Sequence, residues 1–216
     1  MEAPFIALSE IEHDALTELV NIGVSKAAAA LRLMVGEEIL LSVPSIDVVS
    51  HKTAVALLRE REGDKLVAVR QDFSGAFAGR ALLIFPQANS LELVRAVVGD
   101  EMTLEDAAAM EREALAETGN VILNGCLATM ANMLHRSLSM SLPEVLHGDG
   151  SRLFELGDHP DEHSLVLFLY INFAMRDRDI RGYIAMLMDL PSLASLRLLI
   201  GDFIDRVMNE DIPVAV

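Results

Sequence analysis

Apolar residues recur at helical spacing near the start of the chain and predict a long first helix. Its buried stripe consists of Ile11, Ala15, Leu19 and Ile22, joined by Leu16 and Val20. Ser9 and Glu12 have the spacing of a capping box, in which each side chain satisfies a free backbone amide of the first turn. The helix should therefore begin near Ser9 and end around Gly36, a residue type that commonly ends helices.

A second helix, starting after Thr103 and ending near Leu134, repeats the first at an offset of 99 positions. Between residues 12 and 44 the two copies share nine identities. They include the pairs Glu12/Glu111, Ala15/Ala114, Leu16/Leu115, Met34/Met133 and Ser42/Ser141. Residues 90–100 also match residues 192–202, at an offset of 102. The pattern predicts a single domain over residues 1–216, made of two repeats at about 8–100 and 103–208.

Alternating and β-branched segments between the helices predict strands. In the first repeat they cover residues 39–48, 53–58, 65–73 and 80–85, and in the second 139–146, 165–173 and 183–188. Arg61–Lys65 has the glycine and charges of a hairpin turn. Short connections favour an α/β (α+β) fold of pseudo-two-fold symmetry, with one largely antiparallel, continuous sheet and the long helices packed on it. Pro44 and Pro143 recur in register, and we expect them to fix the exit of the first strand.

Composition narrows the function classes. Hydrophobic residues make up 52% of the chain, which excludes disorder, and the formal net charge of −16 argues against nucleic acid or an anionic membrane as partner. Asp189 and Pro191 interrupt the longest apolar stretch, residues 183–200, so we expect no membrane insertion. The single Cys126 permits no internal disulfide, fits a reducing cytoplasm and lies in an apolar helical stretch typical of a core.

Each long helix carries a polar arc, because residues four and seven apart share a face. The first arc is Asp14, Glu18, Asn21 and Ser25, and the second is Glu113, Glu117, Asn120 and Asn124. A solvated helix face would explain either arc alone. Two copies of Glu-x-x-Asn at one offset favour a functional site, because asparagine is a poor helix former with no purpose on a plain surface.

A carboxylate and a carboxamide supply neither a nucleophile nor a metal cage, so they suit docking on a cationic group and orienting a water. A competing metal site would need the histidines and carboxylates of residues 147–163. That segment has no ligand spacing and is rich in Gly and Pro, which predicts a solvated acidic loop. We therefore expect no metal site and read the eleven methionines as core filling.

The pattern Asp/Ser-x3-Glu-x2-Asn with proline 23 residues later, carried twice, resembles the CheC family of chemotaxis phosphatases, relatives of CheX and FliY. The resemblance implies an enzyme that hydrolyses the phospho-aspartate of the response regulator CheY. Asn21 and Asn120 would orient the attacking water, and Glu18 and Glu117 would pair with the regulator's lysine. The Mg²⁺ would belong to the regulator, so the chain would need no cofactor of its own.

The two copies are not equal. Asp14 and Glu113 would support the sites, but Glu113 departs from the family's Asp or Ser, so Glu18 and Asn21 form the firmer pair. Gly119 lowers helix propensity, or lets a partner backbone approach, and the sequence does not separate these readings. The alternative function is a non-catalytic binding module that docks the deamidase CheD, a partner of the family, or the flagellar switch.

Overall fold

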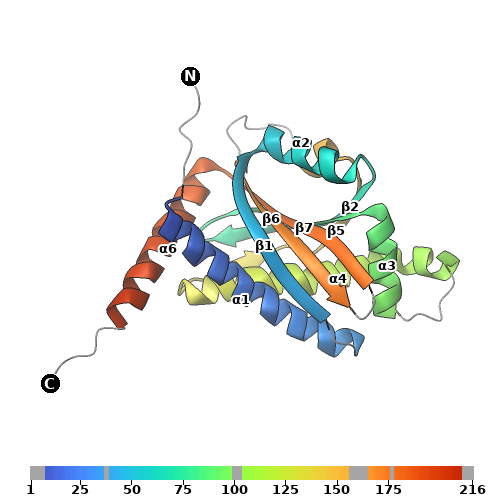
Figure 1. Cartoon of the computed structure of the whole chain (residues 1–216), viewed down its shortest axis with the longest axis horizontal. Coiled ribbons are helices and arrows are strands. Elements are labelled where there is room, and N and C mark those ends of the chain that lie inside the picture. Colours follow the sequence, from blue (N-terminus) through green and yellow to red (C-terminus); the bar gives the residue numbers. More distant parts are fainter. Residues whose placement is uncertain (1–7, 37–38, 99–103, 156–164, 176–177, 211–216) are drawn as a thin grey trace.

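The computed structural model describes residues 8–36, 39–98, 104–155, 165–175 and 178–210. Its centre is one seven-stranded antiparallel sheet, with strands in the order β1-β6-β7-β3-β2-β4 and with β5 also paired to β2 (Figure 1). The strands are β1 (Ile39–Ser50), β2 (Leu66–Gly75), β3 (Gly79–Pro86), β4 (Leu138–Met140), β5 (Glu144–Gly148), β6 (Leu165–Met175) and β7 (Arg178–Met188). The predicted α+β fold with a continuous antiparallel sheet is confirmed.

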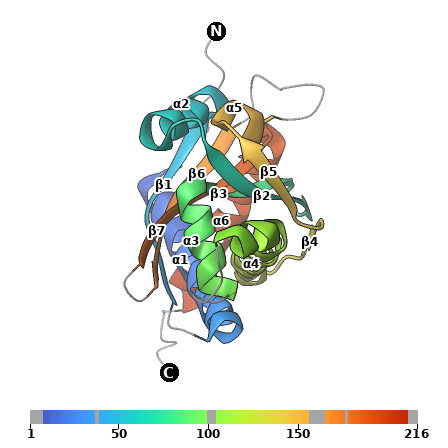
Figure 2. The same ribbon diagram turned by 90° about the vertical axis from the view of Figure 1, so that its right-hand side faces the viewer.

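Helices cover both faces of this sheet. The long helices α1 (Glu10–Val35) and α4 (Leu104–Met133) lie on one face, together with α3 (Gln87–Val98) and α6 (Leu190–Glu210). The short helices α2 (His51–Glu62) and α5 (Gly150–Leu153) lie on the opposite face, as Figure 2 shows. None of the helices in the described ranges is long and apolar enough to cross a membrane.

The ends of α1 follow from its sequence. Ser9 caps the helix and forms the predicted capping box with Glu12, and Gly36 ends the helix in the left-handed conformation at φ 77°. The apolar stripe is shorter than predicted, because Ile11 is 53% exposed and full burial begins at Leu16. The start of α4 at Thr103 lies outside the described residues.

The predicted strand over residues 53–58 is wrong, because this segment belongs to α2. Its β-branched residues suggested a strand, but Ala54 and Leu58 are buried four residues apart, which is helical spacing. Ser50 caps the helix by accepting a hydrogen bond from the Thr53 amide. Gly63, which we assigned to a hairpin turn, ends α2 at φ 77° instead. Local patterning was ambiguous here, and burial against α5 and the sheet decided the outcome.

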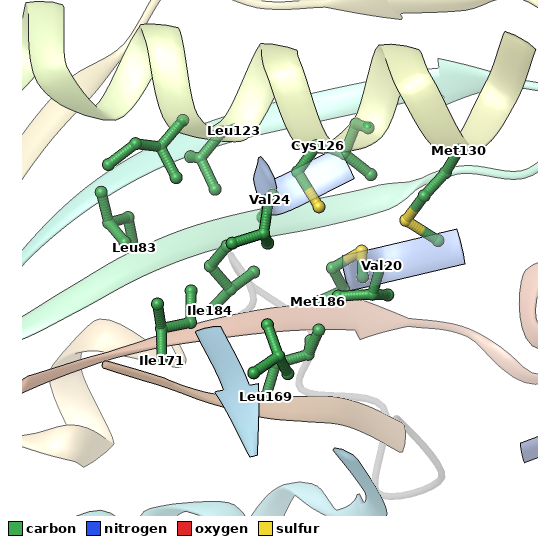
Figure 3. Packing of buried hydrophobic residues seen from close by; sticks show 14 of the residues in the cluster. Val20, Val24, Leu83, Leu123, Cys126, Met130, Leu169, Ile171, Ile184 and Met186 are labelled. Atoms are coloured by element: carbon green, nitrogen blue, oxygen red, sulfur yellow. The ribbon is translucent and has the colours of Figure 1, made fainter. Parts of the chain in front are cut away.

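Two apolar clusters hold the layers together. The larger lies between the sheet and the long helices, where Leu123, Cys126 and Met130 of α4 point toward strand residues (Figure 3). Cys126 is 1% exposed, which confirms that it belongs to the core, and this burial raises its pKa to about 12. A Cβ on Gly23 would lie 2.9 Å from the Cys126 carbonyl oxygen, so α1 and α4 cross at close range.

Strand registers relate the two repeats. Leu41 pairs with Phe173 and Met140 pairs with Phe73, so the first strands correspond at an offset of 99 and β2 corresponds to β6 at an offset of 100. Each first strand pairs with a strand of the other repeat.

Pro44 and Pro143 do not fix a strand exit, contrary to our expectation. The register of β1 shifts between Ser42 and Ser45, around Pro44, and Pro143 stands between β4 and β5. A residue without an amide donor interrupts the ladder at both places.

Candidate active site

The first polar arc lies on the solvent side of α1. Asp14 and Glu18 are exposed, and Asn21 is partly buried. His13 stands beside Asp14, with Nδ1 4.0 Å from an Asp14 carboxylate oxygen, and its Nε2 is 3.0 Å from the Ile46 carbonyl oxygen of β1. Among the residues that the structure describes, the Asn21 side chain makes no hydrogen bond. No hydrogen bond from the described residues therefore fixes the orientation of this carboxamide.

The second arc has the same outline on α4. Glu113 and Glu117 are exposed, and Asn120 is partly buried. The structure brings each predicted set together on one helix face. Across the described ranges, no hydrogen bond or ion pair links one arc to the other, so the geometry consists of two separate faces.

A residue that the sequence did not single out lies beneath the second arc. Gln71 of β2 is 1% exposed, and its Nε2 donates to the Asn120 Oδ1 at 3.2 Å. The Asn124 Nδ2 donates to the same oxygen at 2.7 Å. Two donors therefore hold the Asn120 carbonyl oxygen, whereas no described residue donates to Asn21.

Gly119 explains how Asn120 reaches the sheet. A Cβ at position 119 would stand 2.5 Å from the Val69 side chain of β2, far inside van der Waals contact. The glycine is buried and allows α4 to approach β2 closely, which places the next residue near Gln71. The close approach is thus to the protein's own sheet, not to the backbone of a partner.

Comparisons with known proteins show which families the chain resembles. Residues 67–163 match the family model described as "Chemotaxis phosphatase CheX". The chain is 26% identical to "CheY-P phosphatase CheC" of Bacillus subtilis, over 91% of this chain and 97% of that protein. It is 22% identical to "Putative CheY-P phosphatase CheC1" of Halobacterium salinarum, over 84% of this chain and 92% of that protein. Over most of its length the chain is similar to proteins of the CheC/CheX/FliY phosphatase superfamily.

Solved structures of this superfamily share the fold. The crystal structure of FliY from Thermotoga maritima superposes with a TM-score of 0.72 at 15% identity, covering 92% of this chain and all of that one. At this identity the likeness concerns the arrangement of helices and strands, which here includes the two long helices that carry the arcs.

Some repeated residues of this CheC-like chain have a structural role. Arg197 of α6 donates to a Glu12 carboxylate oxygen at 2.8 Å, and Ser90 of α3 donates to the corresponding Glu111 at 3.0 Å. The hydrogen bond from Arg197 holds the pKa of the Glu12 carboxyl below its ordinary value. Both glutamates therefore attach a long helix to the closing helix of the other repeat.

The segment proposed as a solvated loop is partly regular. His147 lies in β5, and Asp149 caps α5 by accepting from the Arg152 amide at 2.9 Å. Pairing with β2 makes this part a strand, which its glycines concealed. Asp158, His159, Asp161, Glu162 and His163 lie outside the described residues. Among the residues that the structure does describe, no group of three His, Cys, Asp or Glu side chains could hold a metal ion.

Proposed function

We propose that this protein hydrolyses the phospho-aspartate of a chemotaxis response regulator of the CheY type. The observation that carries the proposal is the pair of Glu-x-x-Asn arcs, each exposed on a rigid helix, in a chain similar to proteins of a phosphatase superfamily. The CheC relative that spans nearly the whole chain is a CheY-P phosphatase by name. The substrate would be a partner protein with a cationic group next to its phosphoryl group.

In this mechanism the protein contributes positioning and charge. Asn21 or Asn120 enters the regulator's active site and holds a water in line with the phosphorus atom. Glu18 or Glu117 pairs with the regulator's lysine, and Asp14 or Glu113 supports that contact. The Mg²⁺ that neutralises the phosphoryl oxygens belongs to the regulator. Phosphoryl transfer depends mainly on orientation and electrostatic stabilisation, so a carboxamide on a stiff helix is sufficient for catalysis.

The decay of phosphorylated CheY in the presence of catalytic amounts of the protein tests the proposal. We expect the wild type to accelerate decay and the double variant Asn21→Ala/Asn120→Ala to lose the acceleration, on the order of a hundredfold, as for one orienting group. Single variants measure the share of each arc. Asn132→Ala, an exposed change on α4 outside the arcs, is the matched control. Wild-type protein that leaves the decay rate unchanged would exclude the phosphatase function.

A non-catalytic binding module remains the second candidate. Leu198 of α6 is 73% exposed and Met208 is 62% exposed, so α6 presents apolar side chains to solvent. A module that docks CheD or the flagellar switch would use such a surface and leave phospho-CheY stable. Co-purification of CheD that survives the double asparagine substitution, without any phosphatase activity, would favour this candidate.

A further inference from the structure

We propose that Gln71 is a positioning residue for Asn120 and that it makes the second arc the one that carries most of the turnover. The inference rests on the proposed phosphatase function. It differs from the expectation from sequence alone, which favoured the first arc because Glu113 departs from the family pattern.

A chain of hydrogen bonds fixes the orientation of the Asn120 amide. The Gln71 Nε2 donates to the Ser141 carbonyl oxygen at 2.8 Å, and a carbonyl can only accept, so the amino group of Gln71 must lie on this side. The same amino group faces Asn120 and requires an acceptor there. The Asn120 oxygen is thereby turned inward, and its Nδ2 amino group is left for a ligand.

The corresponding positions of the first repeat lack this arrangement. The strand register matches Gln71 with Ile171, a fully buried residue of the apolar core (Figure 3). At the helix offset, Asn124 corresponds to the exposed Ser25, and Gly119 corresponds to Val20. Three differences thus coincide at one place, where the second repeat has a polar support and the first has apolar packing.

The polar groups around Gln71 are not fully satisfied. Its Oε1 and the Oδ1 of Asn124 are buried without a hydrogen-bond partner among the described residues, an arrangement that costs free energy. The isoleucine of the other repeat avoids this cost. A buried glutamine with an unpaired oxygen that orients a partly exposed carboxamide is typical of a functional site, where unsatisfied groups concentrate.

The two asparagines therefore differ in how far their side chains are oriented before the regulator binds. The Asn120 Nδ2 is already oriented to donate a hydrogen bond to the oxygen of the attacking water, so this side chain needs no ordering when the transition state forms. Asn21 has to be ordered by the regulator as it docks. The second arc should therefore have the higher kcat, while KM, set by the exposed carboxylates around both arcs, should differ little.

Gln71→Ile, which gives the second repeat the residue of the first, tests the inference in two single-site backgrounds. In Asn21→Ala protein, where only the second arc acts, we expect kcat for phospho-CheY to fall about tenfold, the value of one neutral hydrogen bond, with KM unchanged. In Asn120→Ala protein, where only the first arc acts, the same substitution should leave kcat unchanged. Asn124→Ser, a milder change at a partly exposed site, should also lower kcat in the Asn21→Ala protein.

Each other outcome has a defined meaning. An equal loss of kcat in both backgrounds would show a general structural role and overturn the inference, as would Asn120→Ala protein that retains most of the wild-type kcat. Full activity of both Gln71→Ile and Asn124→Ser in the Asn21→Ala background would overturn it as well. If wild-type protein does not accelerate decay at all, the proposed function itself fails, a result that is distinct from the others.

Discussion

Gly119 and Gly201 are both helical glycines with opposite surroundings. A Cβ on Gly119 would meet Val69 at 2.5 Å, whereas a Cβ on Gly201 of α6 would have nothing within 4 Å. We predict that Gly119→Ala destabilises the fold by about 1–3 kcal/mol through overpacking. Gly201→Ala should stabilise it by about 0.5–1 kcal/mol through helix propensity. Urea unfolding of the two variants measures both, and equal stabilities would contradict the proposed close packing of α4 on β2.

Among the residues of the candidate site, those that repeat could be predicted from the sequence, and the one that does not repeat could not. Asn21 and Asn120 stood out because the chain presents them twice. Gln71 had no such signal: a single glutamine in a strand pattern is unremarkable, and its partners Asn120 and Ser141 lie 49 and 70 positions away. Only the three-dimensional pairing of β2 with β4 and the packing of α4 bring these residues together.

At the scale of elements, the contact between Glu12 and Arg197 attaches α6 to the start of α1. The pKa of Glu12 is lowered from 4.5, mainly by the hydrogen bond from Arg197. A depressed carboxyl pKa stabilises the folded state fully above the unfolded value, and the contribution is lost as pH falls through the folded value. The contact should therefore contribute at neutral pH and disappear in acid below about pH 4.5.

Glu12→Gln tests this pH dependence. We expect its deficit in unfolding free energy relative to wild type to be constant between about pH 6 and 8 and to shrink below about pH 4.5, where the wild-type carboxyl also becomes neutral. Urea titrations at several pH values measure the deficit. Glu10→Gln, an exposed change in the same turn, is the control and should show no such trend. A deficit for Glu12→Gln that persists unchanged in acid would contradict the role of its charge.

Element boundaries were predictable where a local signal agreed with packing. The capping box at Ser9 and the glycine at position 36 placed both ends of α1 correctly. The segment that became α2 has both β-branched residues and helical spacing of apolar ones, and the layer it joins on the far side of the sheet was not visible in the sequence. An error of this kind arises because tertiary burial, not local propensity, selects between two possible structures.

At the scale of the whole molecule, the first strand of each repeat pairs with a strand of the other repeat. β1 of the first repeat pairs with β6 of the second, and β5 of the second pairs with β2 of the first. The closing helices follow the same rule, since α6 contacts α1 and α3 contacts α4. The offsets of 99 and 102 in the sequence predicted a duplication. These offsets would be the same whether a strand pairs within its own repeat or with a strand of the other repeat. Sequence therefore indicated the repeat and not the exchange.

This exchange predicts that neither repeat folds alone. A fragment of residues 8–98 would have β1 without its partner β6, and α1 without α4 and α6, so much of the apolar surface around Val20, Val24 and Leu31 would face water. A fragment of residues 104–210 would lack β2 and β3, which stand between β7 and β4 in the sheet. Loss of this burial removes most of the hydrophobic stabilisation that a unit of this size needs.

Circular dichroism and urea unfolding of the separate fragments, with the intact chain as control, test the prediction. We expect each fragment alone to unfold without a cooperative transition, and co-expressed fragments to form a one-to-one complex with a single transition. The complex should also restore any phosphatase activity of the intact chain, because the second arc depends on both fragments: Asn120 comes from the second fragment and Gln71 from the first. Cooperative unfolding of either fragment alone would show that the repeats are independent domains, against the single domain that the interleaved sheet implies.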